Sequence, residues 1–126
     1  MEKKVLYQID ATLSDVVNKK CPILHFIEII NSKWKFPIIW YLHEKNSTRY
    51  NELKRRIPNI TKIMLTKSLR ELERDGLVCR KILKKDPPKE IEYSLTEMGK
   101  NLMPAMNEIY SWSLKQMELM KEKIFN

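Results

Sequence analysis

The pattern of apolar and polar positions is clearest in the middle of the chain, between Thr48 and Asp75. Three apolar residues recur there at intervals of three and four, which places them on one face of a short helix: Tyr50, Leu53 and Ile57. Pro58 follows directly and should end this helix, because proline has no amide to donate and its ring clashes with the preceding turn. The segment therefore predicts a short amphipathic helix and then a turn.

A second helix is predicted after this turn. Thr61 is well placed as its N-cap, because a threonine hydroxyl accepts a hydrogen bond from an early helical amide. Leu65, Leu69 and Leu72 recur at helical spacing and should face a core. The other face carries mostly cationic and polar residues: Lys62, Ile63, Thr66, Lys67, Arg70 and Arg74. Two short helices of this kind indicate a helix-turn-helix whose second helix lies in a DNA major groove.

Two helices are predicted upstream. The first opens at Cys21-Pro22, because proline is favoured in a first helical turn, and its buried face should comprise Ile23, Phe26, Ile27 and Ile30. The second runs over residues 33–43, with Pro37 near its start and with Trp34, Ile38, Ile39 and Leu42 on its apolar face. A very short strand is possible at Thr48-Arg49, directly before the helix-turn-helix.

A β-hairpin is predicted downstream, after Gly76 as a helix C-cap. Residues 77–84 are β-rich, Asp86-Pro87-Pro88 is a turn signal, and residues 90–95 alternate apolar and polar side chains. The tip of this hairpin carries Lys84, Lys85 and Lys89. Such a hairpin is typical of the wing of a winged helix, whose lysines reach phosphates or the minor groove. The alternative is an edge hairpin that lysine keeps soluble.

The last predicted helix starts after Thr96 as N-cap, and Pro104 is expected to bend it. Its wide apolar surface exceeds what one small domain can cover, so we expect a second copy of the chain to bury it. Residues 1–20 form an arm or short helix that packs on its own domain or on a partner chain. We therefore divide the chain into the arm 1–20, a DNA-binding domain 21–103 and a dimerisation helix 104–126, with dimer contacts at Leu13, Val16, Met106, Ile109, Trp112 and Met120.

The charge distribution supports a polyanionic partner. The 126-residue chain carries a net charge of +8, and residues 49–89, with 13 basic and 5 acidic side chains, account for all of it. Clustered cations of this kind are typical of DNA-binding surfaces, and the alternative is a basic solvated face. No apolar run approaches the roughly 20 residues of a membrane span, and the first residues do not look like a signal peptide, so we expect a cytoplasmic protein without membrane contact.

The sequence gives no support for catalysis. His25 and His43 are its only histidines, and no cluster has the spacing of metal ligands or of a catalytic triad. The 2 glycines leave no room for a glycine-rich phosphate loop. We therefore expect neither an enzyme nor a bound metal or cofactor. The remaining rival is a protein-interaction module on a winged-helix scaffold that binds DNA only non-specifically.

Several motifs occur together and in register from residue 21 to about residue 112: CPI at 21–23, KW at 33–34, RYNELKRRIPNITKIMLTKSLRELERDGLV at 49–78, PPKEIEYSLTEMGKNL at 87–102, and Trp112. This order resembles the HxlR-type winged helix-turn-helix transcriptional regulators of bacteria. The resemblance implies a mainly α fold with a small β-hairpin (α+β) that dimerises through terminal helices. It implies a cytoplasmic homodimer, most often a repressor, that binds double-stranded DNA at a pseudo-palindromic operator, with recognition helices about 34 Å apart.

The expected DNA contacts fall in two groups. The recognition helix would contribute Thr61, Lys62, Ile63, Thr66, Lys67 and Arg70, and the first helix and the wing would contribute Arg49, Tyr50, Asn51, Lys84, Lys85 and Lys89. The family usually has a small or prolyl residue and arginines early in the recognition helix, where this chain has Lys62-Ile63 and Lys67-Ser68. Fewer bidentate guanine contacts are expected, because lysine is a point donor.

Cys21 is a candidate redox sensor, since some members of the family sense oxidants or electrophiles through the cysteine before this proline. A helix N-terminus and the neighbouring Lys19 and Lys20 favour its thiolate. The alternative is a buried cysteine that packs at the helix start. Cys79 is interpreted as a small packing residue, and no structural disulfide is expected in a reducing compartment. The sequence does not identify a small-molecule effector.

Overall fold

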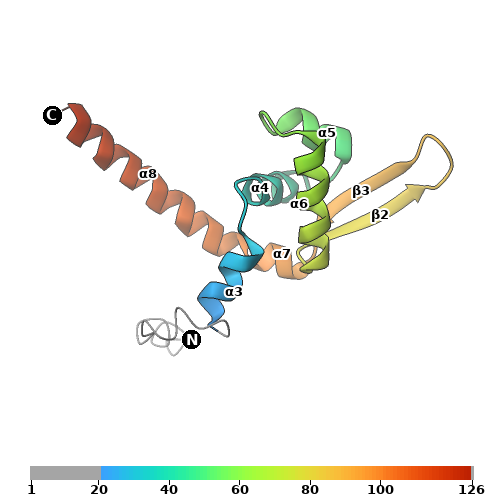
Figure 1. Cartoon of the computed structure of the whole chain (residues 1–126), viewed down its shortest axis with the longest axis horizontal. Helices are drawn as coiled ribbons and strands as arrows, with labels where there is room; N and C mark the ends of the chain where they lie inside the picture. The colour runs from blue at the N-terminus through green and yellow to red at the C-terminus, as the bar shows by residue number, and fades with distance from the viewer. Residues whose placement is uncertain (1–20, 126) are drawn as a thin grey trace.

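The computed structural model describes residues 21–125, so the predicted arm 1–20, including Leu13 and Val16, lies outside the described residues. The elements follow in the order α3 (Pro22–Ile29), α4 (Lys35–Lys45), β1 (Ser47–Arg49), α5 (Tyr50–Arg56), α6 (Lys62–Arg74), β2 (Val78–Lys84), β3 (Glu90–Leu95), α7 (Glu97–Asn101) and α8 (Met103–Phe125). The helices α4, α5 and α6 gather beside the β2–β3 hairpin, and α8 extends away on the opposite side (Figure 1). The predicted winged helix-turn-helix is confirmed.

The sheet has three antiparallel strands in the order β1-β3-β2. The hairpin pairs Val78 with Leu95 and Arg80 with Tyr93, and the possible strand at Thr48-Arg49 is real, because Thr48 pairs with Tyr93. Strand β1 ends where α5 begins, so the backbone that enters the helix-turn-helix is also hydrogen-bonded to the wing. The sheet thereby fixes where the hairpin lies relative to α5 and α6.

The hydrophobic core lies between these helices and the base of the sheet. The predicted leucine face of α6 is buried, and so is the apolar face of α4. Leu53 of α5, Val78 of β2 and Leu95 of β3 complete this core from the other elements. The buried hydrophobic residues of the cluster are Ile38, Ile39, Leu42, Leu53, Ile57, Ile60, Leu65, Leu69, Leu72, Leu77, Val78, Leu95, Met103 and Met106. Among the described residues, no helix is both long enough and apolar enough to cross a bilayer.

The turn from α6 into β2 is tight and closed by backbone hydrogen bonds. Gly76 has a φ of 83°, which glycine adopts without the penalty of a Cβ atom. Its amide donates to the Glu73 carbonyl (3.1 Å) and the Leu77 amide donates to the Leu72 carbonyl (2.9 Å), which is the Schellman pattern of a helix end. The predicted C-cap is therefore confirmed, and only residues 75–77 separate α6 from β2.

The start of α7 is docked onto this turn. The Thr96 hydroxyl donates to the Gly76 carbonyl and accepts from the Gly99 amide at 3.1 Å, so the predicted N-cap is also confirmed. Gly99 lies against the turn so closely that a Cβ atom there would be 2.3 Å from the Leu77 carbonyl oxygen. The tight turn and α7 therefore depend on each other.

Four residues differ from the sequence-based expectation. Ile23 and Ile27 of α3 are 45% and 49% exposed, since none of the described elements covers that side of the helix. Met106, expected at a dimer contact, is 1% exposed, because the first turns of α8 still pack on the core of their own chain. Cys79 was interpreted as a packing residue but is exposed, because its neighbour Val78 takes the inward position on β2.

Candidate nucleic-acid interface

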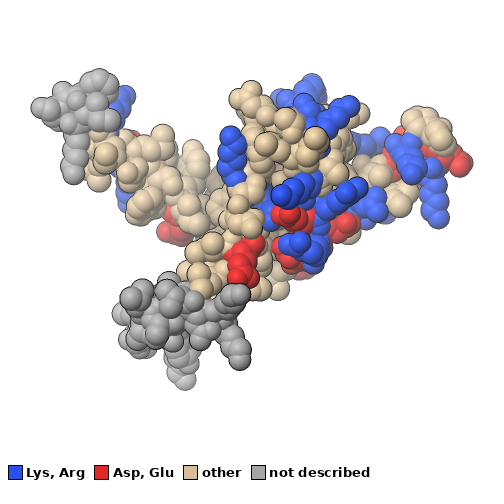
Figure 2. Space-filling view, viewed as in Figure 1, with Lys and Arg blue, Asp and Glu red and all other residues tan. Residues whose placement is uncertain are grey.

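The exposed face of α6 is an open, cationic groove. Lys62, Ile63, Thr66, Lys67, Arg70 and Glu71 line a volume of about 560 Å³ on this face. In the part of the chain that the structure describes, Lys62, Lys67 and Arg70 form no ion pair, so their charges are available to an external anion. Figure 2 shows lysine and arginine side chains gathered over the helix-turn-helix and the hairpin.

Two hydroxyl groups set the start of α6 and its angle to α5. Thr61 is the N-cap that the sequence predicted, and its Oγ1 accepts from the Met64 amide at 3.1 Å. The Tyr50 hydroxyl donates to the Lys62 carbonyl oxygen and lies within hydrogen-bonding distance of Thr66 Oγ1, both at 3.0 Å. Tyr50 therefore braces α5 against α6, and the hydroxyl of Thr66 is engaged within the protein.

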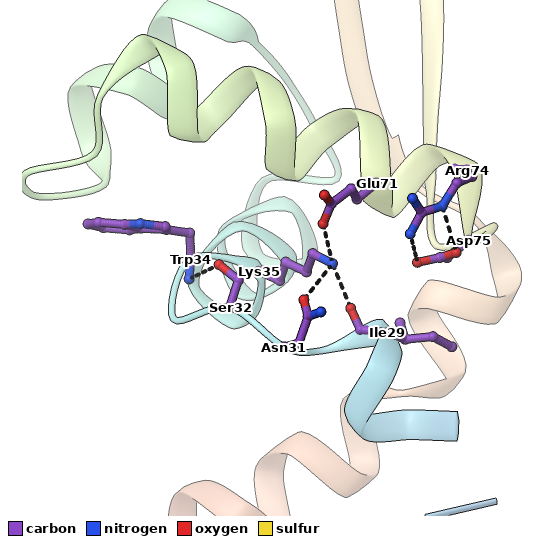
Figure 3. A network of polar contacts seen from close by, with 8 residues as sticks. All are labelled: Ile29, Asn31, Ser32, Trp34, Lys35, Glu71, Arg74 and Asp75. Carbon is purple, nitrogen blue, oxygen red and sulfur yellow. Dashed lines mark hydrogen bonds and ion pairs between the residues drawn. The ribbon is translucent and has the colours of Figure 1, made fainter. Parts of the chain in front are cut away.

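A buried ion pair attaches α6 to α4 and to the end of α3 (Figure 3). The Lys35 side chain is 1% exposed, and its Nζ donates to Glu71 Oε1 at 2.8 Å, to the Ile29 carbonyl at 2.7 Å and to Asn31 Oδ1 at 3.4 Å. The nearby ammonium holds the pKa of Glu71 below its usual range. One side chain of α4 thus connects the end of α3 to α6, and its ammonium has a partner for each of its protons.

Sequence reasoning missed Lys35, although a signal was present. Lys35 precedes Ile38, Ile39 and Leu42 by three, four and seven residues, so it shares their buried face on α4. A lysine in such a position needs an acidic partner, because an unpaired charge is costly to bury. Glu71 is that partner, and it also lines the groove on the exposed face of α6.

The basic residues of α5 are partly neutralised within the helix. Glu52 accepts hydrogen bonds from Arg55, from Arg56 Nε at 3.0 Å and from the Tyr41 hydroxyl at 2.9 Å. These donors, Arg55 first, lower the pKa of Glu52 to about 2, so the carboxylate stays charged. Both arginines of α5 are therefore paired, whereas Lys62, Lys67 and Arg70 of α6 have no ion pair among the described residues.

The tip of the hairpin carries a second set of cations. Lys84, Lys85 and Lys89 are exposed there, as predicted for a wing. Arg49 is 53% exposed and pairs loosely with Glu90 at 3.7 Å, and Asn51 is exposed at the start of α5. The hairpin extends from beside α6 in the direction away from α8 (Figure 1). The fold therefore carries two cationic elements, the exposed face of α6 and the hairpin tip.

Cys21 lies at the other end of the fold, where α3 begins. Its side chain is 7% exposed, and it makes no capping hydrogen bond to α3. Beyond it, an apolar cavity of about 220 Å³ between α3 and α7 is lined mainly by Phe26, Ile29, Ile30, Leu77, Met98 and Leu102. Within residues 21–125, no three His, Cys, Asp or Glu side chains are grouped as metal ligands would be.

Comparisons with known proteins agree with this geometry. A sequence model of the HxlR-like helix-turn-helix family matches residues 29–121. The HTH-type transcriptional regulator YdeP of Bacillus subtilis is 43% identical over 95 residues, which cover 75% of this chain and 73% of YdeP. The redox regulator HypR in its reduced form has a TM-score of 0.72 at 35% identity, covering 80% of this chain and 98% of that chain.

A third relative has the same fold. The reduced form of the transcriptional regulator YodB from B. subtilis has a TM-score of 0.65 at 31% identity, covering 74% of this chain and 90% of that chain. The matched family consists of transcriptional regulators and is not a class of enzymes. From the family match and from its identity to YdeP, the chain belongs to the HxlR family of winged helix-turn-helix transcriptional regulators.

Proposed function

We propose that this regulator is a homodimeric repressor that binds a pseudo-palindromic operator by inserting α6 into the major groove. The observation that supports this most strongly is the free charge on the exposed face of α6. Lys62, Lys67 and Arg70 have no acidic partner within the described chain, whereas the arginines of α5 do. Free cations on a braced helix fit a phosphate-rich groove, where phosphate contacts position the protein and base contacts give specificity.

The hairpin is the second DNA contact in this proposal. Its exposed lysines at positions 84, 85 and 89 would neutralise phosphates beside the groove that α6 enters. Such contacts carry no base preference, so they add affinity on any sequence. The proposal therefore assigns specificity to α6 and salt-dependent affinity to the wing.

Dimerisation is assigned to α8. Beyond its first turns this helix exposes a long series of large apolar side chains, of which Tyr110 also packs against Trp40 of α4: Ile109 43%, Tyr110 54%, Trp112 66%, Leu114 44%, Met117 62%, Leu119 61% and Met120 43%. A continuous apolar surface of this kind is typical of an interface between copies. The contacts that we propose on α8 are Ile109, Trp112 and Met120; Met106 is excluded because it is buried in its own chain.

A response to oxidants or electrophiles through Cys21 is the regulatory part of the proposal. Two relatives support it: HypR is a redox regulator, and YodB has also been crystallised after treatment with diamide. Cys21 lies at the N-terminus of α3 and is a free cysteine. Since α3 is joined to α6 through Lys35, a shift of α3 on oxidation would reach the DNA-binding helix.

Selection of bound fragments from genomic DNA, with and without oxidant, tests the proposal. We expect the selected fragments to share one inverted-repeat motif. Oxidant should weaken binding to this motif by the wild type and by Cys79→Ser, but not by Cys21→Ser.

Variants of the proposed DNA contacts test the two elements separately. Arg70→Ala should weaken operator binding by roughly 1–3 kcal/mol and broaden the range of sequences selected. Lys85→Ala should weaken all DNA equally and reduce the salt slope by about 1, and Lys115→Ala on α8 serves as a control for loss of charge. Sequence-blind binding in every variant would instead indicate a protein-interaction module.

A further inference from the structure

Among residues 21–122, Ile63 is the most exposed large apolar side chain, at 81%. It lies in the first turn of α6, on the same face as Lys67 and Arg70, and it lines the groove that these cations share. The packing of the protein does not account for it, because Leu65, Leu69 and Leu72 supply the buried face of this helix. An isoleucine in this position therefore points to an apolar group on whatever the groove binds.

The surroundings of Ile63 restrict the chemistry of that group. Lys62 is adjacent in sequence and Lys67 is one turn further on. The bound molecule must therefore carry negative charges on either side of a small apolar group. In the major groove of DNA the exposed apolar group on the bases is the C5-methyl of thymine. A protein partner fits poorly, since a stable protein interface buries about 1,200 Å² or more and needs an apolar patch larger than one side chain surrounded by cations.

We propose that Ile63 determines part of the operator sequence by packing against the C5-methyl of a thymine in each half-site. This inference rests on the proposed function, because it requires α6 to enter the major groove. The N-terminal residues of a recognition helix are the ones that reach base edges, and Ile63 is the second residue of α6. Lys67 and Arg70, further along the same face, contact neighbouring bases or phosphates and fix the register of the methyl contact.

Replacing thymine by deoxyuridine tests this contact, because it removes the methyl and leaves base pairing intact. The operator would first be selected with the wild-type protein, and duplexes carrying deoxyuridine at each thymine position in turn would then be titrated by fluorescence anisotropy. Burial of one methyl-sized group corresponds to about fourfold in affinity, so we expect one thymine per half-site with a loss of about fourfold, and about sixteenfold when both half-sites are changed.

The variant Ile63→Ala should bind the thymine operator more weakly and lose this sensitivity to deoxyuridine. Alanine favours helix and the side chain is exposed, so the fold should be retained. Lys85→Ala, the matched control, should bind more weakly but keep the full deoxyuridine effect. Circular dichroism of both variants checks that α6 is intact.

Three results would overturn the inference. A specific operator at which no thymine responds to deoxyuridine would refute the methyl contact while the proposed function stands. An unchanged deoxyuridine effect in Ile63→Ala would assign the methyl to another residue. If selection yields no motif and all duplexes bind alike, the proposed function fails and the methyl contact fails with it.

Discussion

Removing Glu71 should destabilise the protein far more than removing a neighbouring acid on the same helix. In Glu71→Ala the ammonium of Lys35, which is 1% exposed, keeps only the Ile29 carbonyl and the Asn31 amide oxygen as partners. Breaking a buried pair in this way costs about 3–5 kcal/mol, because a charge is left without compensation. Glu71 itself is 24% exposed, so water can partly solvate the site, and we expect about 3 kcal/mol.

Glu73→Ala is the matched control, two residues along α6. Its pair with Arg80 spans 3.6 Å between side chains that are each 42% exposed, and such a pair contributes well under about 1 kcal/mol. Both variants make the same change from glutamate to alanine, so helix propensity cancels between them. The difference in their unfolding free energies therefore isolates the buried contact.

Urea unfolding followed by circular dichroism, at one fixed protein concentration, measures both variants. The double variant Lys35→Met/Glu71→Ala removes the charge together with its partner, so it should be less destabilised than the sum of the two single variants. A Glu71→Ala protein as stable as Glu73→Ala, or strict additivity in the double variant, would refute the interpretation of Lys35 as a buried, paired charge.

The same contact has a defined pH dependence. Lys35 lowers the pKa of Glu71 in the folded protein, so the folded state binds this proton less readily than the unfolded state does. The stabilisation is complete above the ordinary carboxylate pKa of 4.5 and is lost as the pH falls through the lower folded pKa. The difference in stability between wild type and Glu71→Ala should therefore shrink below about pH 4.5.

Further variants test the packing, the cap and the interface. Gly99→Ala should destabilise by about 1–3 kcal/mol in urea unfolding, because its Cβ would lie 2.3 Å from the Leu77 carbonyl oxygen; a neutral result would show that α7 moves freely on the turn. Thr61→Ala should cost about 1 kcal/mol, while Thr61→Ser, which keeps the hydroxyl, should cost less. Trp112→Glu should give monomers in sedimentation velocity, and persistent dimers would assign the interface elsewhere.

The local signals in the sequence predicted most of the fold. Thr61, Thr96 and Gly76 are capping residues whose action depends on a few neighbouring backbone groups, so a reader of the sequence can place them correctly. The leucine spacing of α6 likewise reports its buried face directly. These features determine the position of the candidate DNA-binding helix and of the hairpin after it.

What the sequence could not show depends on residues far apart in the chain. The partner of Lys35 is 36 positions away, and no local pattern links the two. Periodicity marks an apolar face but not what covers it, so Met106 inside the core looked the same as Trp112 outside it. Strand β1 has only three residues, and its identity as a strand comes from pairing with β3.

The three-residue passage from α6 to β2 bears on the length of the DNA site. The Gly76 and Leu77 amides are hydrogen-bonded back to α6, and the Thr96 hydroxyl at the start of α7 donates to the Gly76 carbonyl, so this passage is held from both sides. We therefore expect the base of the hairpin to keep its position relative to α6. A half-site lengthened by one base pair between its major-groove and flanking contacts is then expected to lose one of the two contacts.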